Sequence, residues 1–138
     1  MRKILLVGMV VSFVLVLAIG TAYAATISGT SGPDRLVGTP THDTIFARAG
    51  SDTVLGKGGP DVLYGGKGAD TLKGGTSRDT LYGGAGNDSL YGGPDGTQTP
   101  QKGDDEFYCG AGNDTVYVEK GEHSRHDYGP QCENVVTL

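Results

Sequence analysis

The chain has 138 residues, of which 25 are glycine, 3 are phenylalanine and none is tryptophan, so a conventional core of large side chains is excluded. Its 16 acidic and 11 basic residues give a net charge of −5. This acidity argues against nucleic acids and anionic membranes as partners, because both bind clusters of Lys and Arg. Because glycine raises the entropic cost of folding, another source of stability is required.

The N-terminal segment has the pattern of a secretory signal peptide. Arg2 and Lys3 precede an apolar run over residues 4–19, and residues 22–24 read Ala-Tyr-Ala. This pattern predicts export, with cleavage after Ala24 and an extracellular location. The alternative is a retained membrane anchor, but the run has only 16 residues, whereas a spanning helix needs about 20. Without residues 1–24, 114 residues remain with 9 basic and 16 acidic side chains, a net charge of −7 that suits one small domain.

A nine-residue repeat follows and is the dominant signal of the chain. The best units read G-G-x-G-x-D-x-U-x, where U is a large apolar residue two places after the aspartate. The alternative, a series of ordinary surface turns, would not require the aspartate and U to stay in register over seven units. The regularly spaced aspartates are Asp34, Asp43, Asp52, Asp61, Asp70, Asp79 and Asp88.

Each unit predicts a tight turn followed by a short strand. The glycine-rich part favours positive φ, and the x-U-x triplet is rich in Thr, Val, Tyr and Leu, which favour strands. The U side chains would then form a thin core while their neighbours point outward.

The register slips after Gly93, where residues 94–102 form a polar loop rich in Pro and Gly. The pattern resumes at Asp105 and ends with a unit around Asp114. Because Asp88 and Asp105 are 17 residues apart, we interpret this region as one unit with an eight-residue insertion.

These units resemble the RTX, or haemolysin-type, calcium-binding repeat family. The resemblance covers residues 29–117 and is closest over residues 65–70 and 83–88. It implies an all-β fold, a right-handed parallel β-roll over residues 25–117 in which two units make one coil. The coil would arrange the aspartates in two columns, one with Asp34, Asp52, Asp70, Asp88 and Asp114, the other with Asp43, Asp61, Asp79 and Asp105.

Stacked carboxylates of this kind predict bound cations. Strands lie about 4.8 Å apart, and two charges at that distance repel by about 3.5 kcal/mol at an effective dielectric constant of about 20. Calcium accepts carboxylate and carbonyl oxygens in tolerant geometry, whereas magnesium demands a stricter octahedron and zinc prefers His and Cys. We therefore predict several Ca²⁺ ions, bound by the nine aspartates and by turn residues Gly66, Gly68, Gly75, Gly84, Gly86, Gly110 and Gly112.

The predicted sites are unequal. The turns before Asp34 and Asp43 are degenerate, and residues 47–49 replace the glycine pair before Asp52. The most complete surroundings belong to Asp61, Asp70, Asp79 and Asp88.

Residues 118–138 lack the repeat and are predicted to cap the open end of the stack. The residues expected to pack there are Val116, Val118, Val135, Val136 and Leu138. Cys109 and Cys132 are the only cysteines, and export favours a disulfide between them over two free thiols. Its loop of about 24 residues would contribute about 3 kcal/mol.

No catalytic motif is present, so we predict a non-enzymatic protein. A polar cap loop explains Glu119, Glu122, His123 and His126 more simply than a transition-metal site. The remaining alternatives are a stand-alone calcium-binding module and a calcium-dependent adhesin, glycan binder or ice binder. An aromatic column could bind sugars, although cross-strand packing is commoner; it comprises Phe46, Tyr64, Tyr82 and Tyr108. Ice binding would need regular Thr or Asn rows in the turns, which the chain lacks.

Overall fold

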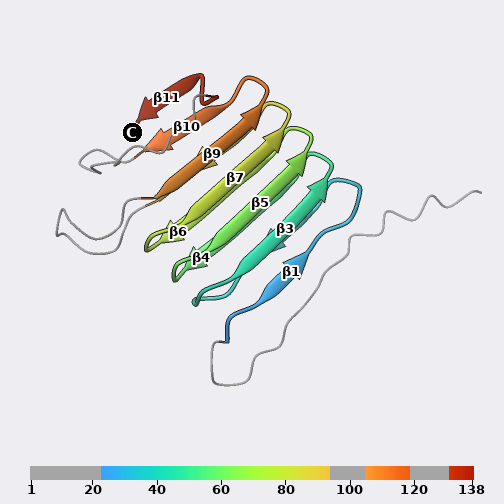
Figure 1. Cartoon of the computed structure of the whole chain (residues 1–138). Coiled ribbons are helices and arrows are strands. Elements are labelled where there is room, and N and C mark those ends of the chain that lie inside the picture. The colour runs from blue at the N-terminus through green and yellow to red at the C-terminus, as the bar shows by residue number, and fades with distance from the viewer. Residues whose placement is uncertain (1–22, 94–104, 119–130) are drawn as a thin grey trace, which may run out of the picture.

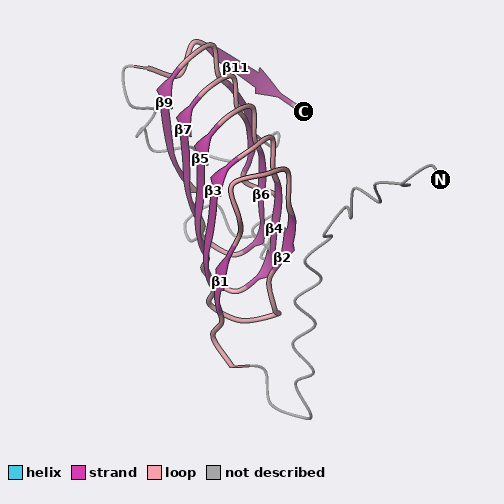
Figure 2. Cartoon of the chain, turned by 90° about the vertical axis from the view of Figure 1, so that its right-hand side faces the viewer, coloured by secondary structure: helices cyan, strands magenta, loops and turns pink. Residues whose placement is uncertain are grey.

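The chain coils into a parallel β-solenoid of about five turns, which confirms the predicted all-β class (Figure 1). The computed structural model describes residues 23–93, 105–118 and 131–138, and these residues contain eleven strands in two sheets. Successive strands alternate between the sheets, apart from the last two, which lie in the same sheet, so that two units make one coil (Figure 2). Among these residues there is no helix with the length and hydrophobicity that a membrane span requires.

Both sheets contain only parallel strand pairs. The first sheet has the order β1 (Thr26–Ser28), β3 (Thr44–Ala49), β5 (Val62–Lys67), β7 (Thr80–Ala85) and β9 (Glu106–Ala111). The second has the order β11 (Asn134–Thr137), β10 (Thr115–Val118), β8 (Ser89–Tyr91), β6 (Thr71–Thr76), β4 (Thr53–Gly58) and β2 (Arg35–Val37).

Most strands are longer than the predicted triplet. β5, for example, has six residues, because the second and third residues of the next unit also pair with the neighbouring turn. Thus Arg48 pairs with Gly66 and Ala49 with Lys67, in the same 18-residue register as Ile45 and Leu63. The start of each glycine-rich turn therefore belongs to the sheet.

The insertion leaves the stack intact. Leu81 pairs with Phe107, and Leu90 pairs with Val116, at a separation of 26 residues instead of 18. The difference of eight residues confirms the interpretation of one unit with an eight-residue insertion. The predicted loop itself, residues 94–102, lies outside the described residues, as do the signal peptide up to residue 22 and the polar segment with His123 and His126.

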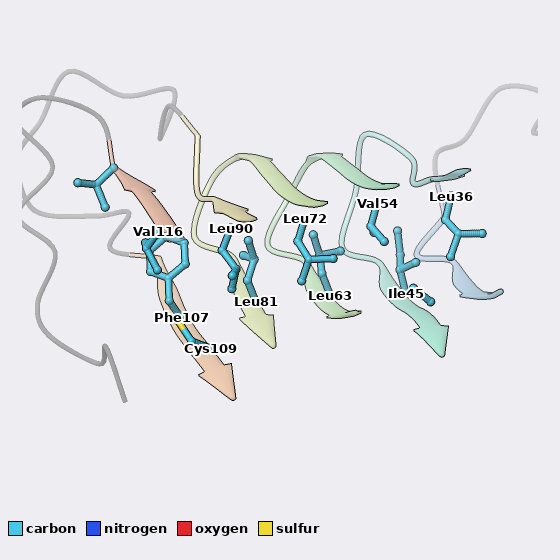
Figure 3. Packing of buried hydrophobic residues seen from close by; sticks show 12 residues of the cluster. Leu36, Ile45, Val54, Leu63, Leu72, Leu81, Leu90, Phe107, Cys109 and Val116 are labelled. Carbon is cyan, nitrogen blue, oxygen red and sulfur yellow. The ribbon is translucent and has the colours of Figure 1, made fainter. Parts of the chain in front are cut away.

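The core consists mainly of U side chains, which come alternately from the two sheets and meet between them (Figure 3). Each turn of the solenoid contributes one or two of these side chains. Those in the middle of the stack, such as Leu63 and Leu72, are fully buried. The buried cluster comprises Leu36, Ile45, Ala47, Val54, Leu63, Leu72, Leu81, Leu90, Phe107, Cys109, Val116 and Val118. Because this core is small, interactions in the turns must contribute much of the stability of the fold.

The C-terminal segment differs from the predicted cap. β11 adds to the second sheet in repeat register, with Val116 opposite Val135, so the repeat does not end at residue 118. Val116 and Val118 are buried as expected, but Val135, Val136 and Leu138 are 49%, 39% and 57% exposed. The prediction that these three pack was wrong, because β11 is the outermost strand of its sheet among the described residues.

Three turn residues adopt left-handed backbone without being glycine: Arg48, Lys57 and Ser77. Lys57 has φ of 88° at the second position of its unit, where Gly66 and Gly75 stand in the following units. The left-handed region costs a non-glycine residue about 1–2 kcal/mol.

We expect Lys57→Gly to stabilise the calcium-loaded protein by about 0.5–1 kcal/mol, since relief of strain exceeds the entropy that glycine adds to the unfolded chain. Urea unfolding at saturating calcium measures the change. Lys67→Gly is the matched control, because Lys67 is exposed and has no positive φ. If both substitutions destabilise the protein equally, strain at Lys57 is unimportant.

Candidate metal centre

The two aspartate columns predicted from the sequence are present. In each column the backbone N–H of one aspartate donates to Oδ1 of the aspartate in the next turn, at 2.7–2.9 Å. The contacts Asp79 to Asp105 and Asp88 to Asp114 continue both columns past the insertion. The columns therefore run through the interior of the solenoid, one along each set of turns.

The second carboxylate oxygen is the unusual feature of these side chains. It is buried and has no hydrogen-bond partner in Asp52, Asp61, Asp70, Asp88 and Asp114. A buried oxygen without a partner costs about 1–3 kcal/mol, and more when it carries charge. A repeated arrangement of such oxygens indicates that something else satisfies them.

Backbone carbonyls of the turns supply further oxygens. Gly66 and Gly68 have φ of 111° and 116°, and a side chain on either would collide with the carbonyl oxygen of Arg48 or Gly50 in the preceding turn. The same left-handed backbone and carbonyl contacts recur at the other predicted turn ligands: Gly75, Gly84, Gly86, Gly110 and Gly112. Carbonyl oxygens thus line up from turn to turn in columns of their own.

Carboxylate and carbonyl oxygens also approach each other at the first position of the unit. A Cβ atom on Gly65 would lie 2.6 Å from Oδ2 of Asp70 and 2.5 Å from the carbonyl oxygen of Gly83 in the next turn. Gly83 stands in the same relation to Asp88 and to the carbonyl of Cys109. Oxygens from adjacent turns therefore converge on one place, which is the donor set that calcium prefers.

A family model described as the RTX calcium-binding nonapeptide repeat, in four copies, matches residues 28–63, 64–96 and 101–122. The chain belongs to the RTX repeat family. No curated protein and no solved structure matches it. RTX nonapeptide repeats bind several Ca²⁺ ions, so the protein is a calcium-binding β-roll.

The residues of this RTX chain fit calcium better than zinc. No group of three or more His, Cys, Asp or Glu side chains gathers within the described part of the chain. The available oxygens are instead single carboxylates combined with backbone carbonyls, a mixture that calcium accepts and zinc does not favour.

The first two RTX units satisfy their aspartates internally. Oδ2 of Asp34 accepts hydrogen bonds from the N–H and hydroxyl of Thr30, at 2.6 and 2.9 Å. Thr39 contacts Asp43 in the same way, with its N–H at 2.5 Å and its hydroxyl at 2.9 and 3.1 Å from the two oxygens. These two predicted ligands therefore differ from Asp52, Asp61, Asp70 and Asp88, whose Oδ2 has no hydrogen-bond partner.

Sequence reasoning missed the role of these threonines and of Glu133. Thr30 and Thr39 each stand four residues before an aspartate, and this shared spacing could have predicted their contacts with Asp34 and Asp43. Glu133 is not preceded by the G-G-x-G-x sequence of the repeat. Glu133 and Val135 nevertheless keep the spacing of the unit, an acidic residue followed two places later by an aliphatic one. The backbone N–H of Asp114 donates to Oε2 of Glu133 at 2.8 Å, as it would to a further aspartate.

Five of the buried carboxyls have raised pKa values: Asp52, Asp61, Asp70, Asp88 and Asp114. Burial raises the pKa of Asp61 from 3.8 to about 7, a hydrogen bond from the Asp43 backbone lowers it, and the charge of Asp43 raises it. The pKa of Asp88 is likewise raised, to about 6. Burial is the main cause, a hydrogen bond from the Asp70 backbone lowers the pKa, and the negative charges of Asp70 and Asp114 raise it. The calcium-free fold therefore holds protons that the unfolded chain releases near pH 3.8.

We expect the metal-free protein to be more stable near about pH 5 than near about pH 8, because stability from these protonated carboxyls is lost as pH rises through their folded pKa. With calcium the direction reverses, since the ion requires ionised carboxylates. Circular dichroism of the metal-depleted protein and urea unfolding of the calcium-loaded protein, each at both pH values, test this. Equal pH dependence in the two states would contradict the expectation.

Proposed function

We propose that the protein is a secreted module that folds when calcium ions bind between successive turns of its β-roll. Asp61, Asp70, Asp79 and Asp88 would be the main carboxylate ligands, with Asp52, Asp105 and Asp114 beside them. The glycine carbonyls at the second and fourth positions of the turns would complete the coordination. Calcium supplies the positive charge that cancels repulsion between stacked carboxylates.

One observation carries this proposal. Within residues 23–93, 105–118 and 131–138, every buried polar or charged side chain is an aspartate, namely Asp43, Asp52, Asp61, Asp70, Asp79, Asp88, Asp105 and Asp114. No Lys or Arg of this part is buried among them to balance the charge. Buried charges persist only when they are paired or bind metal ions. A cation from solvent is therefore the expected partner.

Calcium binding is tested directly by isothermal titration of metal-depleted protein at about neutral pH, in the millimolar range used by extracellular modules, about 10⁻⁴–10⁻³ M. Several ions should bind per chain, and magnesium should not replace them. The same titration with Asp61→Asn and Asp88→Asn should show fewer ions. Absence of calcium binding by the parent chain would refute the proposed function.

Export is part of the proposal and is supported by the pattern of residues 1–24 and by the disulfide between Cys109 and Cys132. Disulfides persist in oxidising compartments outside the cytosol. Mass spectrometry of protein recovered outside the cell should find a chain that begins at Ala25. A chain that retains residues 1–24 would contradict cleavage.

A calcium-dependent adhesin or glycan binder is the second candidate, and the aromatic column favours it only weakly. Its four rings stack along the first sheet at centroid distances of 4.6–4.8 Å: Phe46, Tyr64, Tyr82 and Tyr108. The ring faces cover one another, whereas sugars bind to open faces, so packing explains the column better. A glycan array probed with and without calcium separates the two roles.

A further inference from the structure

Glu133 occupies the aspartate position of an additional, irregular unit. β11 pairs with β10 so that Asn134 lies opposite Thr115 and Val135 lies opposite Val116. Val135 therefore stands in the U position, and Glu133, two residues earlier, stands where the repeat has aspartate. The separation between Asp114 and Glu133 is 19 residues, one more than in a regular coil.

The contacts of Glu133 reproduce those of a column aspartate. Asp88 donates its N–H to Oδ1 of Asp114 at 2.8 Å, and Asp114 donates its N–H to Oε2 of Glu133 at the same distance. The next residue also follows the pattern, because Asn134 donates its N–H to the carbonyl of Asp114 as Thr115 does to that of Asp88. The longer Glu side chain thus takes over the place of aspartate at the end of the column.

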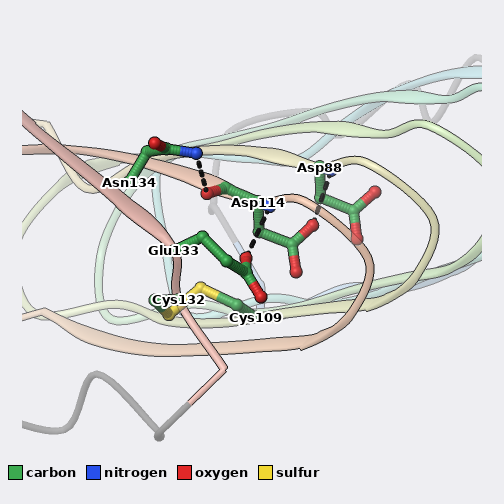
Figure 4. Close-up of a disulfide and its surroundings, with 6 residues drawn as sticks. All are labelled: Asp88, Cys109, Asp114, Cys132, Glu133 and Asn134. Carbon is green, nitrogen blue, oxygen red and sulfur yellow. Dashed lines mark hydrogen bonds between the residues drawn. A yellow bond between two sulfur atoms is a disulfide. The ribbon is translucent and has the colours of Figure 1, made fainter.

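The carboxylate next to Glu133 has an unused oxygen. Asp114 is fully buried, its Oδ1 accepts the Asp88 N–H, and its Oδ2 has no hydrogen-bond partner. Figure 4 shows the Asp114 carboxyl lying between Asp88 and Glu133. Burial raises the pKa of Asp114, and the negative charge of Glu133 raises it further. Two carboxylates therefore meet at the last turn, and no Lys or Arg side chain is buried beside them among the described residues.

The disulfide holds this arrangement together. Cys132 directly precedes Glu133 and is bonded to Cys109 of β9, with Cα atoms 5.2 Å apart (Figure 4). β11 itself is exposed along its whole length, so its sheet contacts alone are weak. Cys109 is buried, and it stands at the first position of the Asp114 unit. The covalent bond thus fixes Glu133 to the turn that carries Asp114.

We propose that Asp114 and Glu133 form a terminal calcium site that depends on the Cys109–Cys132 disulfide, an inference that rests on the calcium-binding function proposed above. Glutamate suits such a site because it binds calcium through both oxygens in other proteins. The site lies at the open end of the stack, where Glu133 is exposed. It fills last and empties first, and it makes calcium occupancy at this end sensitive to reduction.

Native mass spectrometry across a calcium titration tests the site. Glu133→Gln keeps an oxygen that can accept the Asp114 N–H but removes the charge, so it should bind one ion fewer than the parent. The remaining ions should bind with affinities within about twofold of the parent values, because distant sites act independently. Glu106→Gln, at the half-buried first position of β9, is the matched control and should leave the ion count unchanged. Reduction of the parent, or Cys132→Ser, should remove the same ion.

The outcomes separate this inference from the function on which it rests. If Glu133→Gln binds as many ions as the parent while Asp70→Asn binds fewer, the terminal site is wrong and calcium binding by the β-roll stands. If Glu133→Gln loses an ion but the reduced protein does not, the dependence on the disulfide is wrong. If the parent binds no calcium at all, both the site and the proposed function fail.

Discussion

Removing calcium at about pH 8 should abolish most of the β-sheet circular dichroism of the protein, and restoring it to about 10⁻³ M should bring the signal back. At this pH Asp61, with its pKa of about 7, and Asp88, with its pKa of about 6, are largely ionised. Protonation therefore cannot substitute for the metal. The expected change is a transition of the whole stack rather than a local loosening.

The size of the effect follows from the repulsion between turns. Neighbouring carboxylates about 4.8 Å apart repel by about 3.5 kcal/mol at an effective dielectric constant of about 20, and each column contains several such pairs. A small domain has a net stability of only about 5–15 kcal/mol. The buried cluster comprises only twelve side chains among the described residues, so it has little reserve to absorb this cost. Each turn contacts only its neighbours, and loss of one weakens the next.

Magnesium at equal concentration is the control, because it reproduces the ionic strength and charge but not the coordination of calcium. Chelated protein should remain unfolded in magnesium. A folded spectrum in excess chelator, with the metal content verified to be nil, would show that the carboxylate columns are stable without calcium and would overturn the proposed coupling of folding to binding.

Most of the fold was predictable because a strict period fixes register. Aspartates nine residues apart, with U two places later, leave one way to bring every U inside, and the observed pairing of Ile45 with Leu63 follows it. The insertion did not obscure the register, because Asp105 and Asp114 are again nine residues apart and re-enter their columns together. The disulfide was predictable for a simpler reason, since the chain has only two cysteines.

The ends of the stack were harder to predict because their residues depart from the repeat while keeping its geometry. Glu133 replaces aspartate at a separation of 19 residues, and no period of nine reveals it. Arg48 and Lys57 adopt the left-handed backbone of glycine, so the absence of a glycine pair did not predict a different turn. In these places sheet pairing with the neighbouring turn, rather than local preference, determines the conformation.

The differences between sites depended on contacts that only the structure reveals. Thr30 and Thr39 lie at the second position of their turns, where the backbone brings their hydroxyls to the carboxyls of Asp34 and Asp43. Hydrogen bonds there satisfy the Oδ2 atoms, which remain without partners in Asp52, Asp61, Asp70 and Asp88. The sequence ranked these two sites low because their glycines are missing, whereas the physical reason is the presence of alternative donors.

Asp70→Asn should therefore weaken calcium binding far more than Asp34→Asn. Asp70 is buried at mid-column and contacts the turns on both sides, because its Oδ1 accepts the Asp52 N–H and its own N–H donates to Asp88. Asparagine keeps the acceptor but removes the charge, and loss of one charged oxygen contact of about 1.5–3 kcal/mol lowers affinity about tenfold or more. Asp34 is only half-buried, and Thr30 already occupies its Oδ2.

The same substitution should have the opposite effect when calcium is absent. Burial raises the pKa of Asp70, and the charge of Asp52 adds to the rise, so the ionised side chain destabilises the metal-free fold. Asp70→Asn relieves this repulsion, so at about pH 8 the metal-free variant should retain more β-sheet circular dichroism than the metal-free parent, while gaining less from calcium. Titration calorimetry of both variants, and their circular dichroism with and without calcium, measure the two effects. Equal losses of affinity in the two variants, or a metal-free Asp70→Asn protein less stable than the parent, would show that the buried carboxylates are not held for calcium.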